Sequence, residues 1–108
     1  MEPSQLLKGV LEGCVLEIIR REETYGYEIV RTLRAFGFEN VVEGTIYPML
    51  LRCEKNGYLK SRRVESEIGP KRKVFSLTQE GEQYLDAFLD QWTRLRDNVD
   101  RLTDRSSI

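Results

Sequence analysis

Residues 43–80 read EGTIYPMLLRCEKNGYLKSRRVESEIGPKRKVFSLTQE, and this stretch decides the fold. Its first part has apolar residues at intervals of three and four, which is typical of a helix with one buried face. The residues on that face are Ile46, Met49, Leu50 and Cys53. The intervening residues face outward, where a partner can reach them: Thr45, Tyr47, Pro48, Arg52 and Lys55.

Two strands follow this helix. Asn56-Gly57 is a pair that ends helices, and 58–64 is rich in strand-forming residues. Gly69-Pro70 then breaks the chain before a second strand at 74–77. The order helix, strand, basic loop, strand and new helix predicts a winged helix-turn-helix. The expected fold class is mainly α with a two-stranded β wing.

Two helices are predicted before this stretch. The first is capped by Ser4 and has a wide apolar face that extends to Ile19. Within it, Gly9 and Gly13 either mark close contact with another helix or are simply tolerated glycines. The second helix runs from about Tyr25 to Phe36, with Thr24 as its cap.

Three details of these helices are also predicted. Gly37 stops the second helix, and its inward residues are Ile29, Val30, Leu33 and Phe36. Thr45 is the expected cap of the third helix. That cap would place Pro48 in the first turn, where proline removes no helical hydrogen bond.

The last helix is predicted from Thr78, its capping residue, to about Thr103. A row of apolar residues spaced by three and four follows it: Leu85, Phe88, Trp92, Leu95, Val99 and Leu102. This spacing is that of a helix that pairs with another helix, so it predicts dimerisation. The alternative is packing onto its own domain. The predicted organisation is therefore a winged domain at 1–77, a dimerisation helix at 78–104 and a tail at 105–108.

Composition argues against several classes of protein. The 108 residues include no histidine, and the two cysteines, Cys14 and Cys53, cannot build a usual four-ligand zinc site. No glycine-rich phosphate loop is present, so we expect neither an enzyme nor a cofactor. No apolar run is long enough to span a membrane, and no cleavable signal pattern is present, which predicts a cytoplasmic protein with reduced cysteines in its core.

The charge is unevenly distributed although the formal net charge is only −1. Residues 52–73 contain eight basic and three acidic residues, a surplus of five, whereas residues 78–108 contain seven acidic and four basic residues. The two predicted strands and the loop between them form a hairpin. A local basic surplus of this kind favours contact with a polyanion through that hairpin.

Several short motifs in this order resemble the PadR family of transcriptional regulators, in its shorter form with a single C-terminal helix. They are Leu6-Leu7-Lys8-Gly9, Tyr25-Gly26-Tyr27-Glu28-Ile29, Glu43-Gly44-Thr45-Ile46-Tyr47-Pro48 and Gly69-Pro70-Lys71-Arg72-Lys73. The resemblance implies a homodimeric repressor whose third helix enters the major groove of DNA. Phe75 departs from the pattern, because the family often has tyrosine there.

Candidate DNA-binding residues follow from this arrangement. Residues at the entry of the third helix are candidates for contact with base edges: Glu43, Gly44, Thr45 and Pro48. Three tyrosines offer hydroxyls to phosphate oxygens, a role that the resemblance supports: Tyr25, Tyr27 and Tyr47. Tyr27 could instead pack inside the protein. Basic residues complete the set: Arg52, Lys60, Arg62, Lys71, Arg72 and Lys73, with Arg63 adding to the field.

Two units related by a two-fold axis would bind a near-palindromic operator with half-sites about 34–36 Å apart. Trp92 and Arg96 form a candidate effector site for a planar aromatic anion, and ordinary packing of Trp92 is the alternative. For the whole chain, the competing interpretation is a winged helix that contacts proteins and leaves DNA unbound.

Overall fold

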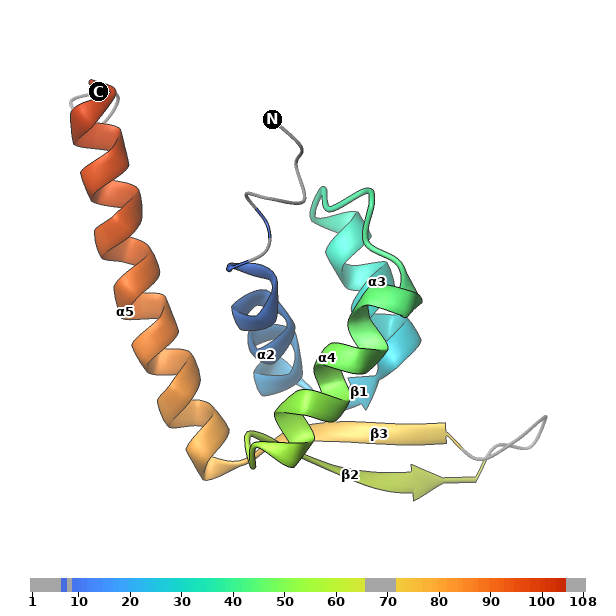
Figure 1. Ribbon diagram of the computed structural model, residues 1–108. Coiled ribbons are helices and arrows are strands. Elements are labelled where there is room, and N and C mark those ends of the chain that lie inside the picture. Colours follow the sequence, from blue (N-terminus) through green and yellow to red (C-terminus); the bar gives the residue numbers. More distant parts are fainter. Residues whose placement is uncertain (1–6, 8, 66–71, 105–108) are drawn as a thin grey trace.

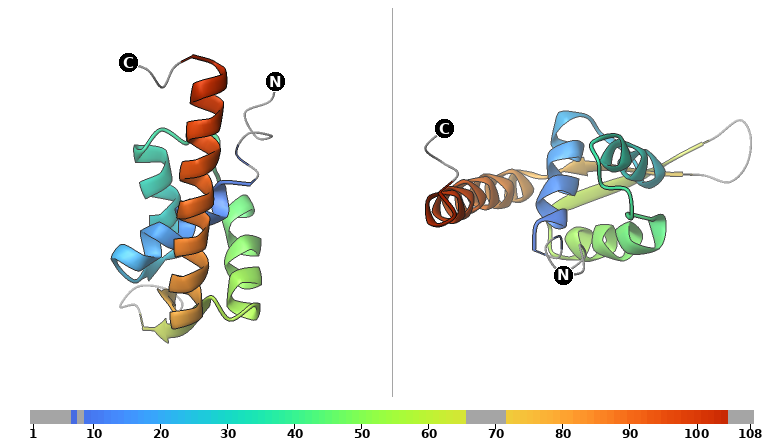
Figure 2. Two further views of the ribbon diagram at one scale, coloured as in Figure 1. Left: turned by 90° about the vertical axis from the view of Figure 1, so that its left-hand side faces the viewer. Right: turned by 90° about the horizontal axis from the view of Figure 1, so that it is seen from above.

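The computed structural model describes residues 7, 9–65 and 72–104. The elements within them are α2 (Leu11–Arg21), β1 (Thr24–Tyr25), α3 (Gly26–Ala35), α4 (Glu43–Lys55), β2 (Leu59–Val64), β3 (Arg72–Leu77) and α5 (Gln79–Leu102). Helices α2, α3 and α4 lie together on one side of a small sheet, while α5 rises from one end of it (Figures 1 and 2). The expected fold, a winged helix-turn-helix with a long C-terminal helix, is confirmed.

The core lies where α2, α3 and α4 meet the sheet. Its largest fully buried side chains include Leu16, Ile29, Leu33, Leu50 and Phe75. The predicted inner face of α4 is confirmed, since Ile46, Met49, Leu50 and Cys53 are all buried. Phe75 keeps its inward position without a tyrosine hydroxyl.

The sheet has three antiparallel strands in the order β1-β3-β2. The predicted wing has only two of them, β2 and β3. The added strand, β1, pairs Thr24 with Phe75 and Tyr25 with Val74. Thr24 is therefore a strand residue, and its prediction as the cap of α3 is wrong. The capping position belongs to Tyr25, whose side chain makes no capping hydrogen bond.

Helix α4 begins earlier than predicted. Val42 is its capping residue and Glu43 its first residue, so Thr45 already lies inside the first turn and is not the cap. The adjacent Val41 is buried in the core, which fixes where the chain enters the helix. Pro48 consequently lies in the second turn, where it lacks the N–H that would bond to the carbonyl of Gly44.

At two other helix ends, one prediction lies outside the described residues and one is wrong. Helix α2 begins at Leu11 after a turn at Gly9-Val10, and the predicted cap Ser4 lies outside the described residues. Phe36 was expected to face inward, but it is 71% exposed because α3 ends at Ala35. Gly37 stops the helix as predicted, with a φ of 105° that favours glycine.

Gly13 allows α5 to approach α2 closely. A Cβ atom at this position would lie 2.1 Å from the ring of Phe88, which is too short for any contact. Gly9 has open space around its Cα, so the predicted helix contact is confirmed at Gly13 and not at Gly9. Glycine at position 13 thus sets the distance between the two helices.

Thr78 caps α5 as predicted, and its Oγ1 accepts a hydrogen bond from the N–H of Gly81 at 2.9 Å. The first part of α5 packs on the rest of the chain, where Leu85 is fully buried and Phe88 packs against the core. Leu85 is therefore a core residue and cannot face a second copy. Along the rest of α5, the apolar side chains are open to solvent. None of the described helices is long and apolar enough to cross a membrane.

Candidate nucleic-acid interface

The outward face of α4 is the first component of the interface. Glu43, Gly44, Thr45, Tyr47 and Pro48 are all exposed, as the sequence predicted. The side directly opposite the buried face is centred on positions 44, 48, 51 and 55, which are spaced by four, three and four. The N-terminal end of this helix points to the same side of the molecule as the hairpin, away from α5 (Figure 1).

Leu51 on this face was not predicted as a functional residue. It is 53% exposed, although it is a large apolar side chain in the middle of a helix. The sequence signal that could have identified it is its position. Leu51 lies four residues after Tyr47 and three after Pro48, on the outward face, and does not belong to the buried stripe that ends at Cys53. The outward face is therefore apolar at its centre.

Tyr47 is held against the start of α3. A Cβ atom on Gly26 would lie 2.8 Å from the Tyr47 ring and 2.9 Å from its hydroxyl oxygen. Gly26 thus leaves room for the Tyr47 side chain to lie across the first turn of α3. The hydroxyl of Tyr47 is brought to the N-terminal end of that helix, where anions are favoured.

The strands supply the cations. The pairing of Arg62 with Val74 and of Val64 with Arg72 puts Lys60, Arg62 and Arg72 on one face of the hairpin. Tyr25 belongs to the same face, because it pairs with Val74 from the other side. Arg63 and Lys73 pair with each other on the opposite face, toward α4. The predicted Lys71 lies outside the described residues.

Three of the predicted DNA-binding cations have carboxylate partners within the chain. Arg62 Nη2 lies 2.5 Å from Glu23 Oε1, Arg52 Nη2 lies 3.2 Å from Glu12 Oε2, and Lys73 Nζ lies 3.4 Å from Glu54 Oε1. Each of these pairs is at least partly exposed, so each contributes little net stability and can exchange for a phosphate. Lys60, Arg63 and Arg72 have no carboxylate partner among the described residues.

Glu54 anchors the side of the hairpin that faces α4. The Ser61 hydroxyl donates to Glu54 Oε2 at 2.5 Å, and Lys73 lies beside the other oxygen. The Ser61 hydrogen bond and the charge of Lys73 together hold the pKa of Glu54 below its usual value. This carboxylate therefore stays ionised and connects both β2 and β3 to α4.

Arg72 is held by aromatic rings. Its guanidinium carbon lies 4.9 Å from the ring centroid of Tyr27 and 5.9 Å from that of Tyr25. The two tyrosine rings are themselves stacked, with centroids 5.8 Å apart. Tyr27, which the sequence left open between phosphate contact and packing, thus has a packing partner on the same surface.

Glu12, on α2, connects helix α4 to helix α5 through hydrogen bonds. Its carboxylate accepts hydrogen bonds from Arg52 on α4 and from the Tyr84 hydroxyl on α5, the latter at 2.8 Å. The Tyr84 ring stacks on Tyr58 with centroids 4.2 Å apart. The hydrogen bond to Glu12, together with burial, raises the pKa of Tyr84 to about 12. The position of α5 is therefore tied to the exposed helix α4.

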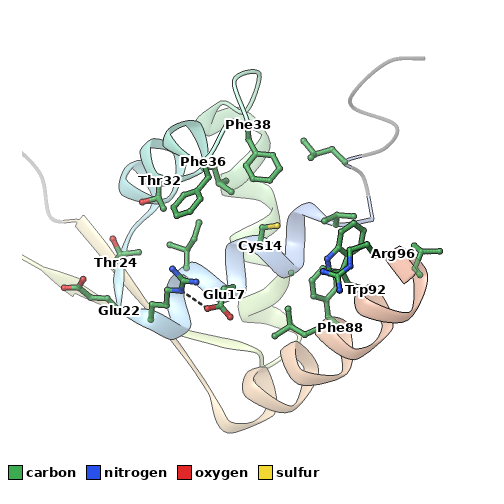
Figure 3. A pocket seen from close by; sticks show the side chains of 18 of the residues that line it. Cys14, Glu17, Glu22, Thr24, Thr32, Phe36, Phe38, Phe88, Trp92 and Arg96 are labelled. Atoms are coloured by element: carbon green, nitrogen blue, oxygen red, sulfur yellow. Dashed lines mark hydrogen bonds and ion pairs between the residues drawn. The ribbon is translucent and has the colours of Figure 1, made fainter. Parts of the chain in front are cut away.

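A groove of about 1010 Å³ lies between α2, α3 and α5. Its lining is mainly apolar and aromatic, and includes Gly13, Cys14, Phe36, Phe38, Phe88 and Trp92. Figure 3 shows Phe88 and Trp92 projecting from α5, with Phe36 and Phe38 across the groove at the end of α3. The sequence predicted Trp92 and Arg96 as an effector site in the dimer seam, and the structure places both on this groove. Phe36 and Phe38 were not predicted as lining residues, because Phe36 was assigned to the core and Phe38 was given no role.

The described part of the chain contains no cluster of three or more histidine, cysteine or acidic side chains that could bind an ion. Burial raises the pKa of the Cys14 thiol, which keeps it protonated within the groove wall. The exposed face of α4, the basic hairpin and the apolar groove are the features that suit a ligand.

The family model for the transcriptional regulator PadR-like family matches residues 15–87. A transcriptional regulator from Streptococcus is similar in structure, with a TM-score of 0.82 and 50% identity over 92% of this chain and 97% of that one. A PadR-like transcriptional regulator from Bacillus cereus has a TM-score of 0.84 and 45% identity over 93% of this chain and 97% of that one.

The PadR protein of Bacillus subtilis, whose structure was determined in complex with operator DNA, is a more distant relative. It shares 26% identity with a TM-score of 0.68, over 74% of this chain and 46% of that chain. The similarity therefore concerns less than half of that protein.

Proposed function

Since this chain belongs to the PadR-like family of transcriptional regulators, we propose that it binds operator DNA sequence-specifically as a homodimer and represses transcription in the cytoplasm. One observation carries the proposal: the N-terminal end of α4, whose outward residues are exposed, points to the same side of the molecule as the hairpin of β2 and β3, which carries the cations (Figure 1). Recognition of duplex DNA requires a helix that contacts base edges in the major groove, called the reading helix below, and cations beside it that contact the phosphates.

In this proposal α4 enters the major groove. Glu43 accepts a hydrogen bond from a cytosine amino group, and the side chains of Thr45 and Pro48 contact thymine methyl groups. Gly44 brings the backbone close to the bases. Leu51 extends the apolar centre of the face by one turn, so we add it to the proposed base-contacting residues.

Phosphate contacts come from the strands and from the tyrosine hydroxyl of Tyr47. Lys60 and Arg63 are available at once, since neither pairs with a carboxylate in the described part of the chain. Arg52, Arg62 and Lys73 would exchange their carboxylates for phosphates on binding, and Lys71 at the hairpin loop is proposed from the sequence. Both faces of the hairpin would then contribute positive charge to the contact with the DNA backbone.

Dimerisation is proposed through the far half of α5. Apolar side chains are open to solvent there: Trp92, Leu95, Val99 and Leu102. Phe88 lies at the junction, since it packs against Gly13 and also lines the groove. A two-fold axis through this row would present two copies of α4 to inverted half-sites of a near-palindrome. The winged domain at 1–77 and the helix at 78–104 would then have separate roles.

The experiment is selection of an operator from random duplex DNA, followed by fluorescence anisotropy at 150 mM KCl. We expect the selected duplex to bind at least about 1,000-fold more tightly than a scrambled duplex of the same composition. The DNA upstream of the gene itself is the natural second probe. Equal affinity for selected and scrambled duplexes would contradict sequence-specific binding, and no binding would favour the protein-contact alternative.

An effector site at the dimer interface is proposed as a finer point. Trp92 is 37% exposed on the wall of the groove, and Arg96 lies one turn further along α5. A planar aromatic anion could stack on the indole and pair with the guanidinium, whose nearest carboxylate, Asp97, lies at 3.5 Å. We expect phenolic anions to quench Trp92 fluorescence. A panel of planar aromatics without any quenching would contradict this site.

A further inference from the structure

We infer that Tyr25 and Tyr27 are positioning residues that hold Arg72 for contact with phosphate through the faces of their rings. This inference rests on the proposed function and deepens it, since it assigns a different role from the phosphate-binding hydroxyls that the sequence suggested. The Arg72 guanidinium lies 4.9 Å from the Tyr27 ring and 5.9 Å from the Tyr25 ring. Arg72 is thereby placed at the edge of the exposed hairpin face.

The backbone brings these three side chains together from separate elements. Tyr25 pairs with Val74 across β1 and β3, and Arg72 lies two residues before Val74, so both side chains project from the same face of the sheet. Tyr27 lies in the first turn of α3 and stacks on Tyr25 with centroids 5.8 Å apart. The register of the short strand β1 therefore fixes the aromatic pair beside the arginine.

The chemistry of this support differs from that of the other cations. Arg62 and Lys73 are held by the carboxylates of Glu23 and Glu54, which a phosphate must displace. Rings that hold a guanidinium by its face leave the N–H groups at its edge free to donate to an anion. Arg72 is exposed, and no carboxylate in the described residues pairs with it. It is thus preorganised to bind a phosphate without breaking an ion pair.

Operator affinity in a set of variants tests this role. We expect Tyr27→Phe, which keeps the ring, to stay within about twofold of the unmodified protein, while Tyr27→Leu and Arg72→Ala each lose about tenfold. The double variant should bind no more weakly than Arg72→Ala, because Tyr27 would act only through Arg72. Arg63→Ala is the matched control: combined with Tyr27→Leu, its loss should be additive.

Two results would overturn the inference. A loss for Tyr27→Phe equal to that for Tyr27→Leu would assign the effect to the hydroxyl. Additive losses for Tyr27→Leu and Arg72→Ala would show that the residues act independently. In either case the unmodified protein would still bind its operator, so failure of the inference is distinct from failure of the proposed function.

A measurement on the free protein further separates failure of the inference from failure of the proposed function. Proton NMR of the free protein should show ring-current shifts of the Arg72 side-chain protons that persist in Tyr27→Phe and become much smaller in Tyr27→Leu, where only the more distant Tyr25 ring remains. Thermal unfolding of the same variants shows whether the fold is retained. Unshifted Arg72 protons in the unmodified protein would contradict the ring-held arginine even if no DNA binding were found.

Discussion

Replacing Leu95 and Val99 together with glutamate is expected to convert the protein to monomers and to weaken operator binding more than about 100-fold. Both side chains are half or more exposed in the single protomer, at 56% and 50%. If they meet their counterparts across a two-fold axis, four carboxylates would be placed in an apolar interface. Burial of unpaired charge there costs more than the interface gains.

A matched pair of substitutions controls for the added charge. Gln83→Glu with Thr93→Glu also adds two carboxylates to α5, but at exposed positions on the side away from the apolar row. This control should remain dimeric and should keep most of its operator affinity. Sedimentation velocity and anisotropy measure the two properties. A dimeric Leu95→Glu/Val99→Glu protein would place the interface elsewhere.

Replacing Gly81 with alanine is expected to lower the free energy of unfolding by about 3 kcal/mol, the upper end of ordinary overpacking. A Cβ atom there would lie 2.1 Å from the carbonyl oxygen of Tyr58 and 2.7 Å from Leu77 Cδ1. The Tyr58 carbonyl is fixed by a hydrogen bond from the Thr78 N–H at 3.1 Å, and Thr78 Oγ1 donates to the Gly57 carbonyl at 2.6 Å. Because the obstacle is backbone, the junction between hairpin and α5 has to shift.

Gly9→Ala is the control for this substitution. Nothing lies within 4 Å of a Cβ atom built on Gly9, and its φ is not in the left-handed region. Its stability should therefore stay close to that of the unmodified protein. Denaturant unfolding measures both variants. Equal stability of the two alanine variants would contradict the close packing at Gly81.

Elements that depend on local periodicity could be predicted from the sequence. The stripe from Ile46 to Cys53 identified the buried face of α4, and the capping hydroxyl of Thr78 located the start of α5. Strands β2 and β3 followed from their strand-forming residues and the turn between them. These features are set by residues close to one another in the chain, which is why they were predictable.

Features that depend on distant contacts were missed. Strand β1 has only two residues and exists because β3 lies beside it, so Thr24 was taken for a helix cap. The apolar row on α5 has a single spacing, and that spacing cannot show that Leu85 faces its own core while Leu95 is open to solvent. The ring contacts of Arg72 likewise join three separate elements.

The most direct test of the central proposal is the salt dependence of operator affinity. Between 50 and 300 mM KCl, a dimer whose two hairpins and reading helices neutralise about six phosphates should give a log–log slope near −5. Such a slope would support the account of an exposed α4 flanked by cationic strands as the DNA-binding surface. Affinity that is absent at 50 mM KCl, or that does not change with salt, would contradict it.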